Sequence, residues 1–584
     1  MISTLLDRIG EWNSQLFREL KGRLKPRNVA LTAGISLAGQ LLLYLFYQTQ
    51  LPGPPTNYHR YCVGNPPPNF QGYRPPEANF NQTFCLRDAT GHFLFDKLNW
   101  ELWWLDIFTG LSFLAIFVLL VGGVYLLVAD LSNEERRGTF GFIRLSPQAG
   151  SSILLGKILG VPILLYLLTA IALPLHLYAA IAAHISLPLV FGFYGVLATA
   201  CFFFYSAALL YGLVSAGLGT FQAWVGSAAV LGFLWLMALM FFVGGDSDTI
   251  TSTPFDWFIL LSPTTMLTYV VSSAPHSLDK IDYGSVKELA KLTWFDLSLF
   301  GRARTAIPFI LGNFAVWTYW AWQGLQRRYD NPNATVLTKQ NSYWLSGSVM
   351  VSMMGFAVQS QQWGKYEHHL YYNFGILLGF ALALSLGLTA ALSPHRQTLQ
   401  DWARYRHQNP RHKRNLLREL IWGEKSPATL AIALNWASVA IILSVGIVML
   451  PFKEYRIPAL SSIVLTAGIA IIYASIAQWM LMMKVAKRGI WAAATVTAVI
   501  LLPVCCFALF GMTPHADSWI WSFSALPMVA TETLAKTTVL WSVLGQWTAI
   551  VLLNSAMTRQ LRQAGESSTK ALERDRAPSL IANS

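Results

Sequence analysis

The chain has 584 residues, of which 54% are hydrophobic and only 12% are charged, and its mean hydropathy is +0.43. Soluble domains carry roughly twice this charged fraction, so the composition excludes an ordinary soluble globular protein. The net charge of +13 would suit a nucleic-acid-binding protein, but most of the 42 Lys and Arg residues lie in segments predicted below to face the cytoplasm. This bias orients membrane spans and explains the charge, so we expect the lipid bilayer as a partner and no nucleic acid.

Residues 1–28 predict an amphipathic helix ahead of the first span. Apolar residues recur at spacings of three and four over 2–24, charged residues lie between them, and Pro26 ends the pattern. A helix of this kind lies in the membrane interface. Its charges are interspersed and no cleavage site follows, which excludes a signal peptide.

The apolar runs predict an all-α, polytopic membrane bundle, because about 20 helical residues cross a hydrocarbon core of about 30 Å. We predict twelve spans with both termini in the cytoplasm. The spans cover 29–47, 105–129, 153–183, 189–217, 222–243, 304–325, 343–359, 373–393, 429–450, 459–482, 490–511 and 534–556.

These spans predict two six-span halves within one chain. The first half covers 29–325 and the second 343–556. A cytoplasmic linker, 326–342, joins them, and the polar residues 557–584 are expected to form a disordered cytoplasmic tail.

Two outer loops are predicted in the first half. The loop 48–103 is rich in Pro and holds Cys62 and Cys85, which would lie on the oxidising side, so we expect a disulfide between them. The loop 244–303 contains apolar pieces too short to span, typical of re-entrant or interfacial helices. An intramembrane histidine, His176, is either functional or simply packed.

The segment Asp130–Lys157 is a charged, turn-rich island between the second and third spans. Ser132 followed three residues later by Glu135 has the pattern of a capping box, so a short helix is expected to begin there. Gly138 can end that helix, because glycine accepts a positive φ. A capped, charged element with an apolar flank, held between two spans, predicts either a docking site for a soluble partner or an ordinary cytoplasmic loop.

The residue order in this island resembles the cytoplasmic loop of type-2 ABC-transporter permeases. The matching order here is Glu135-Arg136-x-Gly138-Thr139, then Leu145-Ser146-Pro147, then Gly156-Lys157 at the next span. The chain departs from the family pattern in that its glycine lies further from the first Arg than expected. In that family the loop is a coupling helix seated in the ATPase subunit, an elbow helix precedes the first span, and outer half-helices precede the sixth. The coupling residues that the resemblance implies are Glu134, Glu135, Arg136, Gly138, Thr139, Leu145, Pro147 and Lys157.

The second half contains a segment in the corresponding position. Residues 415–435 stand between the eighth and ninth spans and repeat a Ser-Pro dipeptide, Ser426-Pro427, before an apolar run. This predicts either a second coupling helix at Leu416–Lys425 or an amphipathic surface helix. Its candidate contact residues are Arg418, Glu419, Glu424 and Lys425.

Catalytic and cofactor motifs are not found. The nearest approach to a phosphate-binding loop, 150–158, has one residue too many between its glycines and Ile158 where a hydroxyl is needed. No metal-ligand spacing and no nucleophile motif occurs, so we expect no cofactor, no metal and no enzymatic activity in this chain. ATP would then be hydrolysed by a separate subunit.

The favoured hypothesis is a permease subunit of an ABC exporter in the inner membrane of a bacterium. One alternative is an ion-coupled secondary transporter or a channel, although the spans are poor in carboxylates. Another is a membrane-embedded enzyme acting on lipid-linked substrates, although neither outer loop offers a paired acid and base. A monomer and a homodimer both remain open, and the substrate is not specified by the sequence.

Overall fold

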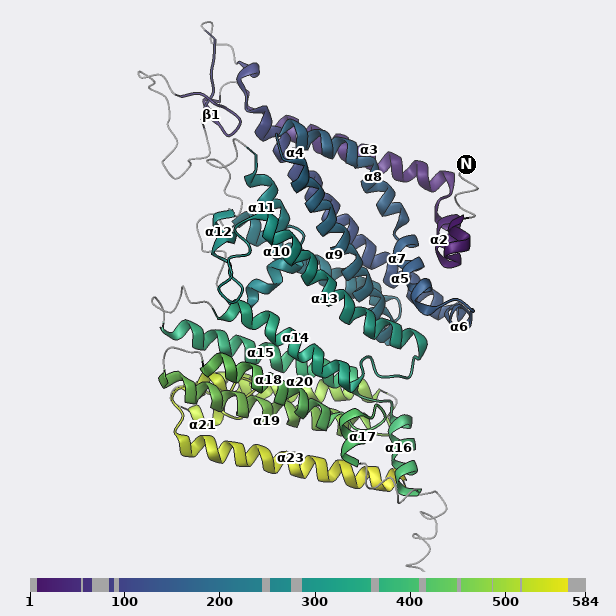
Figure 1. The fold of residues 1–584 in the computed structure, drawn as a ribbon, viewed down its shortest axis with the longest axis vertical. Coiled ribbons are helices and arrows are strands. Elements are labelled where there is room, and N and C mark those ends of the chain that lie inside the picture. The colour runs from purple at the N-terminus through teal and green to yellow at the C-terminus, as the bar shows by residue number, and fades with distance from the viewer. Residues whose placement is uncertain are drawn as a thin grey trace, which may run out of the picture. The chain divides into compact units, whose positions relative to one another are not determined.

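The fold is described from a computed structural model of the chain. The described residues are 8–53, 56–65, 83–88, 94–243, 253–274, 286–358, 367–408, 416–448, 453–485, 487–514 and 517–565. The chain forms two compact units that follow one another at Asp330–Asn331, inside the predicted linker, and the second unit also includes Trp294–Asp296. Figure 1 labels the elements, and each unit is described by itself.

In the residues described for it, the first unit is helical apart from one small pair of strands, in which Tyr58 pairs with Phe84. Its elements are α2 (Ser14–Arg23), α3 (Pro26–Thr49), β1 (Tyr58–His59), β2 (Thr83–Phe84), η2 (Phe95–Lys97), α4 (Trp100–Phe117), η3 (Val118–Gly122), α5 (Gly123–Arg136), α6 (Thr139–Arg144), α7 (Gly150–Gly160), α8 (Ile163–Ala182), α9 (Leu187–Val214), η4 (Ala216–Leu218), α10 (Phe221–Val243), η5 (Pro254–Leu261), α11 (Thr265–Ser272), α12 (Val286–Lys291) and α13 (Ala303–Asp330).

The second unit is built from helices alone in the residues described for it. These are α14 (Lys339–Ala357), α15 (Glu367–Leu392), α16 (Arg396–Gln408), α17 (Leu416–Trp422), α18 (Thr429–Val448), η8 (Lys453–Tyr455), α19 (Arg456–Leu481), α20 (Arg488–Leu509), α21 (Ser518–Trp521), α22 (Met528–Thr531) and α23 (Lys536–Gly565).

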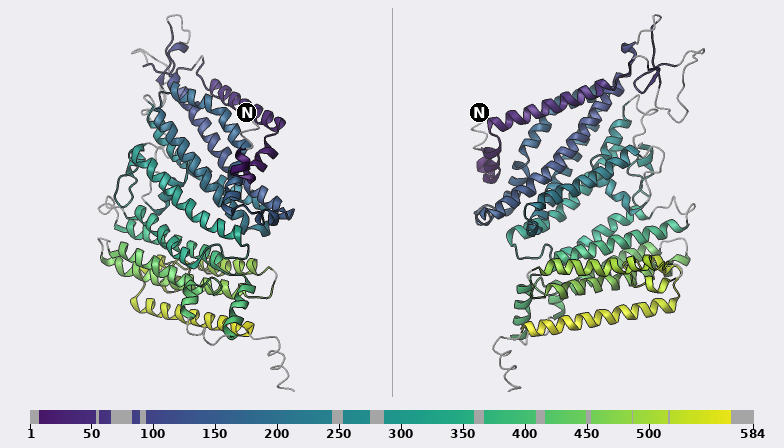
Figure 2. Two further views of the ribbon diagram at one scale, coloured as in Figure 1. Left: turned by 45° about the vertical axis from the view of Figure 1, so that its right-hand side comes forward. Right: turned by 180° about the vertical axis from the view of Figure 1, so that it is seen from behind.

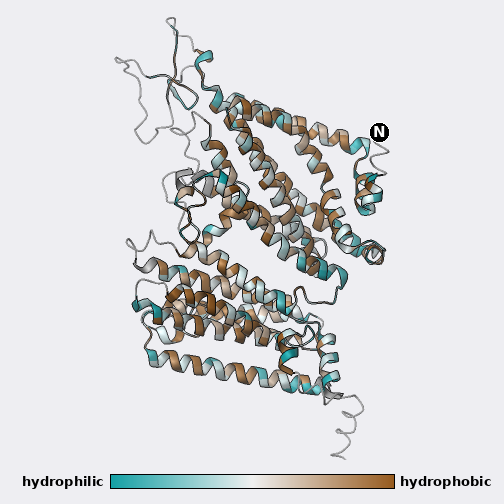
Figure 3. Cartoon of the chain, in the orientation of Figure 1, coloured by the Kyte–Doolittle hydropathy of each residue, from teal (hydrophilic) through white to brown (hydrophobic). Residues whose placement is uncertain are grey.

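Ten helices of the described residues are long and apolar enough to cross a membrane, and they coincide with ten of the twelve predicted spans. The protein is therefore an all-α, multi-pass membrane protein, and Figure 3 shows hydrophobic residues, in brown, along much of its helices. The sixth and seventh predicted spans are the helices α13 and α14, with 28 and 19 residues. Neither is among the ten, and each has polar residues within its run, such as Asn313 in α13 and Gln340 and Asn341 in α14.

The second predicted span is longer than expected and contains an irregular turn. α4, η3 and α5 form one continuous helix, Trp100–Arg136, drawn in blue in Figure 2. Within it, η3 is a π-helical turn. The hydroxyl of Tyr205 donates to the Leu119 carbonyl at 2.7 Å, and that of Ser227 donates to the Val121 carbonyl at 3.2 Å. Hydroxyl groups from α9 and α10 thus satisfy carbonyls in the turn.

The third predicted span, 153–183, is two helices and not one. α7 ends at Gly160 and α8 begins at Ile163, with Pro162 at its N-cap. Proline has no N–H to donate to the preceding turn, which explains the break. α8 alone is the candidate span, and α7 is a shorter apolar helix that precedes its N-terminus.

The expected capping box at Ser132 is wrong. α5 continues through this residue to Arg136, and the Ser132 hydroxyl donates instead to the Gly219 carbonyl at 3.1 Å. The predicted stop at Gly138 is correct, because its φ is +71°, a left-handed conformation that favours glycine. A separate short helix, α6, follows at Thr139–Arg144.

The predicted N-terminal amphipathic helix is interrupted, and its second part is not simply interfacial. Residues 8–12 are helical, Asn13 breaks the helix, and α2 restarts with the Asn13 side chain accepting a hydrogen bond from Leu16 N. α2 packs against α7 and buries Leu16, Leu20 and the charged Glu19. The residues before position 8 lie outside the described part.

On the predicted outer side, Cys62 and Cys85 are joined by a disulfide. It packs with Leu98, and Tyr61 beside it donates to the carboxylate of Asp106 at 2.5 Å. Arg60 adds an ion pair to Asp106 at 2.8 Å. These contacts fasten the described part of the loop to the outer end of α4.

In the second predicted outer loop, α11 is buried over nearly its whole length and contacts α9, while 244–252 and 275–285 lie outside the described residues.

The predicted disordered tail, 557–584, begins too early, because α23 continues to Gly565. Met557 and Leu561 pack against Leu399 of α16, which holds this end of the helix in place. Residues 566–584 are outside the described part.

Candidate functional site at the predicted inner end of the first unit

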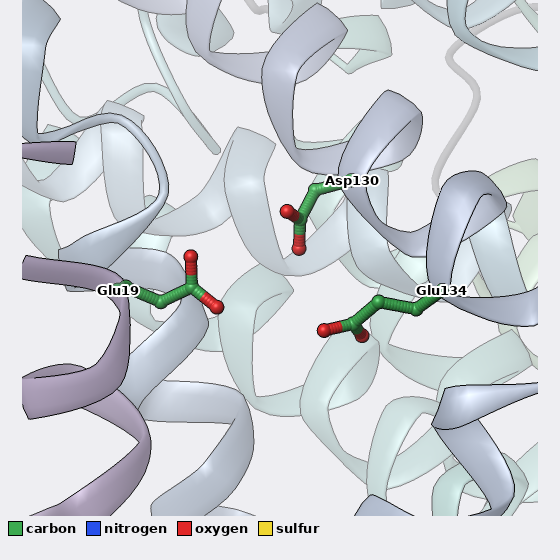
Figure 4. Close-up of side chains that lie close together, drawn as sticks. All are labelled: Glu19, Asp130 and Glu134. Carbon is green, nitrogen blue, oxygen red and sulfur yellow. The ribbon is translucent and has the colours of Figure 1, made fainter. Parts of the chain in front are cut away.

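A network of buried charges joins α2, α5 and α7. Lys157, on α7, has 1% of its side chain exposed, and its ammonium lies 2.7 Å from the carboxylates of both Asp130 and Glu134. Arg23 bridges Asp130 at 2.7 Å and Glu19 at 3.1 Å. Figure 4 shows the carboxylates of Glu19, Asp130 and Glu134 directed toward a common centre.

Arg18 completes this network, which we call the inner charge cluster: Arg18, Glu19, Arg23, Asp130, Glu134 and Lys157. Its guanidinium lies 2.6 Å from Glu134 and 3.2 Å from Glu19. Partial burial disfavours the charged form of Arg18, but the carboxylates of Glu134 and Glu19 outweigh this effect and raise its pKa. The cluster contains three acidic and three basic side chains, so their formal charges cancel.

The carboxylates of Glu19, Asp130 and Glu134 are close enough to hold a metal ion, with ligand atoms within 4.8 Å of one another. Each of them already contacts at least one cation of the cluster, and Lys157 stands between two of them. A metal would have to displace these partners, so the arrangement is that of an internal ion-pair network.

Two glycines on α7 allow α2 to come this close. A Cβ on Gly156 would lie 2.7 Å from the Asn13 side-chain oxygen and 2.9 Å from the backbone N of Leu16. A Cβ on Gly160, one turn further, would lie 2.6 Å from the Cβ of Glu19. Glycines four residues apart are a known means of close helix packing in membranes. The Gly156-Lys157 pair thus brings α2 into place and supplies the central cation.

Replacing Gly156 with Val is expected to separate α2 from α7 and to lower the free energy of unfolding by about 2–3 kcal/mol, because the new side chain meets backbone that cannot move aside. Thermal unfolding of the purified protein in detergent measures this. Gly22→Val on α2 is the matched control, since a Cβ there meets nothing within 4 Å. Equal stability of the two variants would contradict the close-packing role of Gly156.

The short helix α6 is anchored on one face and open on the other. Phe140 is buried and its ring lies 5.7 Å from that of Tyr329 on α13. Arg144 stacks 4.4 Å over Phe140 and donates to the Arg328 carbonyl at 3.3 Å. Burial lowers the pKa of Arg144, while Tyr329 and Glu135 act in the opposite direction.

The open face of α6 carries two large apolar side chains. Phe142, within the helix, is 78% exposed, and Leu145, at its C-cap, is 84% exposed. An anchored helix that presents apolar side chains between charged residues has the character of a docking surface. We call Phe142, Leu145 and their exposed neighbours Glu135 and Arg136 the α6 surface.

The structure divides the predicted coupling residues into two groups. Glu134 and Lys157 belong to the inner charge cluster and have 14% and 1% of their side chains exposed, so neither can serve as a main contact for a partner. The others are exposed around α6, and one of them, Thr139, also donates to the Glu134 carbonyl at 3.2 Å. The exposed members are Glu135, Arg136, Gly138, Thr139, Leu145 and Pro147.

The second predicted segment forms α17, which ends at Trp422 and so is shorter than the expected Leu416–Lys425. Glu419 is engaged internally, accepting from Trp402 and Arg406 at 2.9 Å each. Leu417 and Trp422 are 69% and 53% exposed. Three further predicted contact residues are also exposed: Arg418, Glu424 and Lys425.

A buried lysine of α14, Lys339, positions α17. The ammonium of Lys339 donates to the Leu420 carbonyl and the Ser426 hydroxyl, both at 2.7 Å, and to the Pro427 carbonyl at 3.1 Å. Tyr343 adds a hydrogen bond to the Ile421 carbonyl at 2.7 Å. The end of this short helix is thereby fixed to α14.

Sequence reasoning missed Asp130, Arg18, Arg23 and Lys339. Asp130 and Lys339 lie at the ends of apolar runs, and Arg18 and Arg23 lie among the charged residues of the amphipathic helix α2. Both patterns are usually attributed to the positive-inside bias or to solvation. One sequence signal could have identified the inner charge cluster. The acidic Asp130 lies at the end of one apolar run and the basic Lys157 lies near the start of the next.

Comparison with known proteins adds no assignment. No protein-family description matches the chain, and neither a curated protein nor a solved structure is found that resembles it.

Proposed function

We propose that the protein is the transmembrane permease subunit of an ABC exporter, driven by a separate ATPase that docks on the α6 surface. The observation that carries this proposal is the pair of exposed apolar side chains, Phe142 and Leu145, on a helix fixed at the inner end of the first unit. The proposal includes a location in a bacterial inner membrane and twelve spans with cytoplasmic termini.

Force applied to α6 has two rigid routes into the spans. Phe140 and Arg144 connect α6 to the end of α13. The preceding helix, α5, carries Asp130 and Glu134 of the inner charge cluster and is continuous with the second span. A push on the docking helix would therefore tilt spans and not merely bend a loop, which is what coupling to ATP hydrolysis requires.

The exposed residues of α17 support a second docking point in the other half of the chain. Leu417 and Trp422 present apolar side chains, and Lys339 holds the helix at its end. Two such points suit a pair of ATPase domains, one for each half.

Replacing both Glu135 and Arg136 with Ala is expected to reduce the amount of copurifying ATPase roughly three- to tenfold, because exposed charges at the rim of an interface contribute modestly to binding. The tagged chain is purified from its own cells, and ATP-binding proteins in the eluate are labelled with a photoreactive ATP analogue. The absence of any labelled subunit with the unaltered chain would overturn the proposal.

Topology gives a second, independent test. A single cysteine is placed on α6 by Gly141→Cys, a position where a Cβ meets nothing within 4 Å, in a chain whose free cysteines are replaced with Ser. A membrane-impermeant maleimide should react with it only after the cells are opened. Reaction in sealed cells would place α6 outside, where no ATPase could reach it.

A further inference from the structure

A cavity of about 340 Å³ lies within the first unit, between α3, the α4–η3 helix, α8 and α9. Small-molecule sites measure about 300–1,000 Å³, so this volume accommodates a ligand or part of one. Its walls are mostly aliphatic, with Leu111, Leu168 and Leu197 among them. Residues 118 and 119 of the π-helical turn also contribute, and such turns often occur at functional sites.

The cavity is open toward the lipid. Three of its wall residues keep large exposed fractions, Ile35 at 54%, Leu114 at 48% and Leu173 at 39%. All three lie on candidate spans, α3, α4 and α8, where exposed side chains meet hydrocarbon. A molecule dissolved in the bilayer can therefore enter from the side.

A histidine at the cavity wall is fully hydrogen-bonded as a neutral ring. The Ser112 hydroxyl donates its one proton to the Phe108 carbonyl at 2.8 Å. His176 Nε2 must therefore donate to Ser112 Oγ at 2.8 Å, which leaves Nδ1 to accept from the Tyr194 hydroxyl at 2.7 Å. The Tyr194 oxygen keeps a lone pair as an acceptor at the cavity.

Gln40 supplies a second acceptor. Its amide nitrogen donates to Ser36 Oγ at 3.1 Å, and among the described residues its amide oxygen receives no hydrogen bond. An amide oxygen left without a hydrogen-bond donor in hydrocarbon is costly. No Asp, Glu, Lys or Arg lines the cavity, so a charged ligand would find no counter-ion there.

We propose that this cavity binds a neutral amphiphile from the bilayer, with a long apolar chain and one uncharged hydroxyl group that donates a hydrogen bond to Gln40 or Tyr194. The site depends on the membrane location of the chain and not on the proposed coupling to an ATPase. It is a ligand site within one half, separate from the α6 surface.

Photolabelling of the full chain in phosphatidylcholine vesicles tests this site. The probe is hexadecanol carrying a diazirine in its chain, and labelled peptides are identified by mass spectrometry. Gly39→Phe, which places a ring in the cavity, is expected to reduce labelling of α3 and α8 roughly tenfold. Gly34→Phe is the matched control on the same helix, since both glycines have open space at Cβ but only Gly39 lines the cavity.

Competition defines the ligand class. Unlabelled hexadecanol should displace the probe, whereas hexadecyl phosphate, which carries a charge, should not. Gln40→Leu should weaken competition by hexadecanol roughly tenfold, as expected for a lost hydrogen bond in hydrocarbon, and leave competition by hexadecane unchanged. Equal labelling of the Gly39→Phe and Gly34→Phe variants, or effective competition by hexadecyl phosphate, would overturn the proposal. If Gly39→Phe does not fold, competition by hexadecyl phosphate on the unaltered chain decides the question by itself.

Discussion

The double variant Phe142→Asp, Leu145→Asp is expected to bind its ATPase roughly a thousandfold more weakly and to lose transport. Large apolar side chains at the centre of an interface contribute about 2 kcal/mol or more each, and an unpaired carboxylate buried in their place adds a desolvation penalty. The chain itself should remain folded, because the two side chains are 78% and 84% exposed. Copurification of the ATPase and substrate-stimulated ATP hydrolysis measure the effect.

Val485→Asp is the control for this variant. Val485 is 42% exposed and lies on the predicted inner connection between α19 and α20, away from any predicted coupling residue. This change should leave both copurification and ATP hydrolysis within twofold of the unaltered protein, roughly the effect of an ordinary surface substitution. A folded Phe142→Asp, Leu145→Asp protein with normal ATPase binding would show that the α6 surface is not the docking site.

Replacing Lys157 with Met is expected to lower the free energy of unfolding by about 3–5 kcal/mol, the usual cost of removing one partner from a buried ion pair. The change leaves Glu19, Asp130 and Glu134 with only two cations, Arg18 and Arg23. Their mutual repulsion should push α2 away from α7. Thermal unfolding in detergent and limited proteolysis near Arg23 report these two effects.

A compensating change separates charge from packing. Lys157→Met combined with Glu134→Gln restores neutrality and should recover at least half of the lost stability, which a double-mutant cycle quantifies. Lys21→Met, a change of the same kind at an exposed lysine of α2, should leave stability unaltered. If the compensated protein is no more stable than Lys157→Met alone, the cluster does not act through charge balance.

Local sequence patterns predicted the spans well where apolar residues form long uninterrupted runs. Long apolar runs give helices whatever surrounds them, because the hydrocarbon core leaves the backbone no other way to satisfy its hydrogen bonds. Gly138 was correctly predicted as a stop for a similar local reason, since its φ of +71° is strained for other residues. The runs that contain polar residues, α13 and α14, gave a weaker signal.

Local patterns failed where a distant partner competed. Ser132 has the sequence context of an N-cap, but the Gly219 carbonyl takes its hydroxyl hydrogen bond and α5 continues past it. Glu419 was predicted to face a partner, but Trp402 and Arg406 bind its carboxylate. A residue cannot indicate by itself which of several acceptors or donors the fold will bring to it.

The amino-acid sequence by itself determined that this is a helical membrane protein, because apolar length and charge bias act residue by residue. It also located the short helix α17 approximately, but it placed a short helix before Gly138, where α5 continues, and not after it, where α6 lies. Only the tertiary structure decided which charges are buried and which face a partner. The reason is close packing: Gly156 and Gly160 let α2 approach α7, and Lys157 is buried beside carboxylates distant in the sequence. Phe142 and Leu145, which lie between these elements in the sequence, remain exposed.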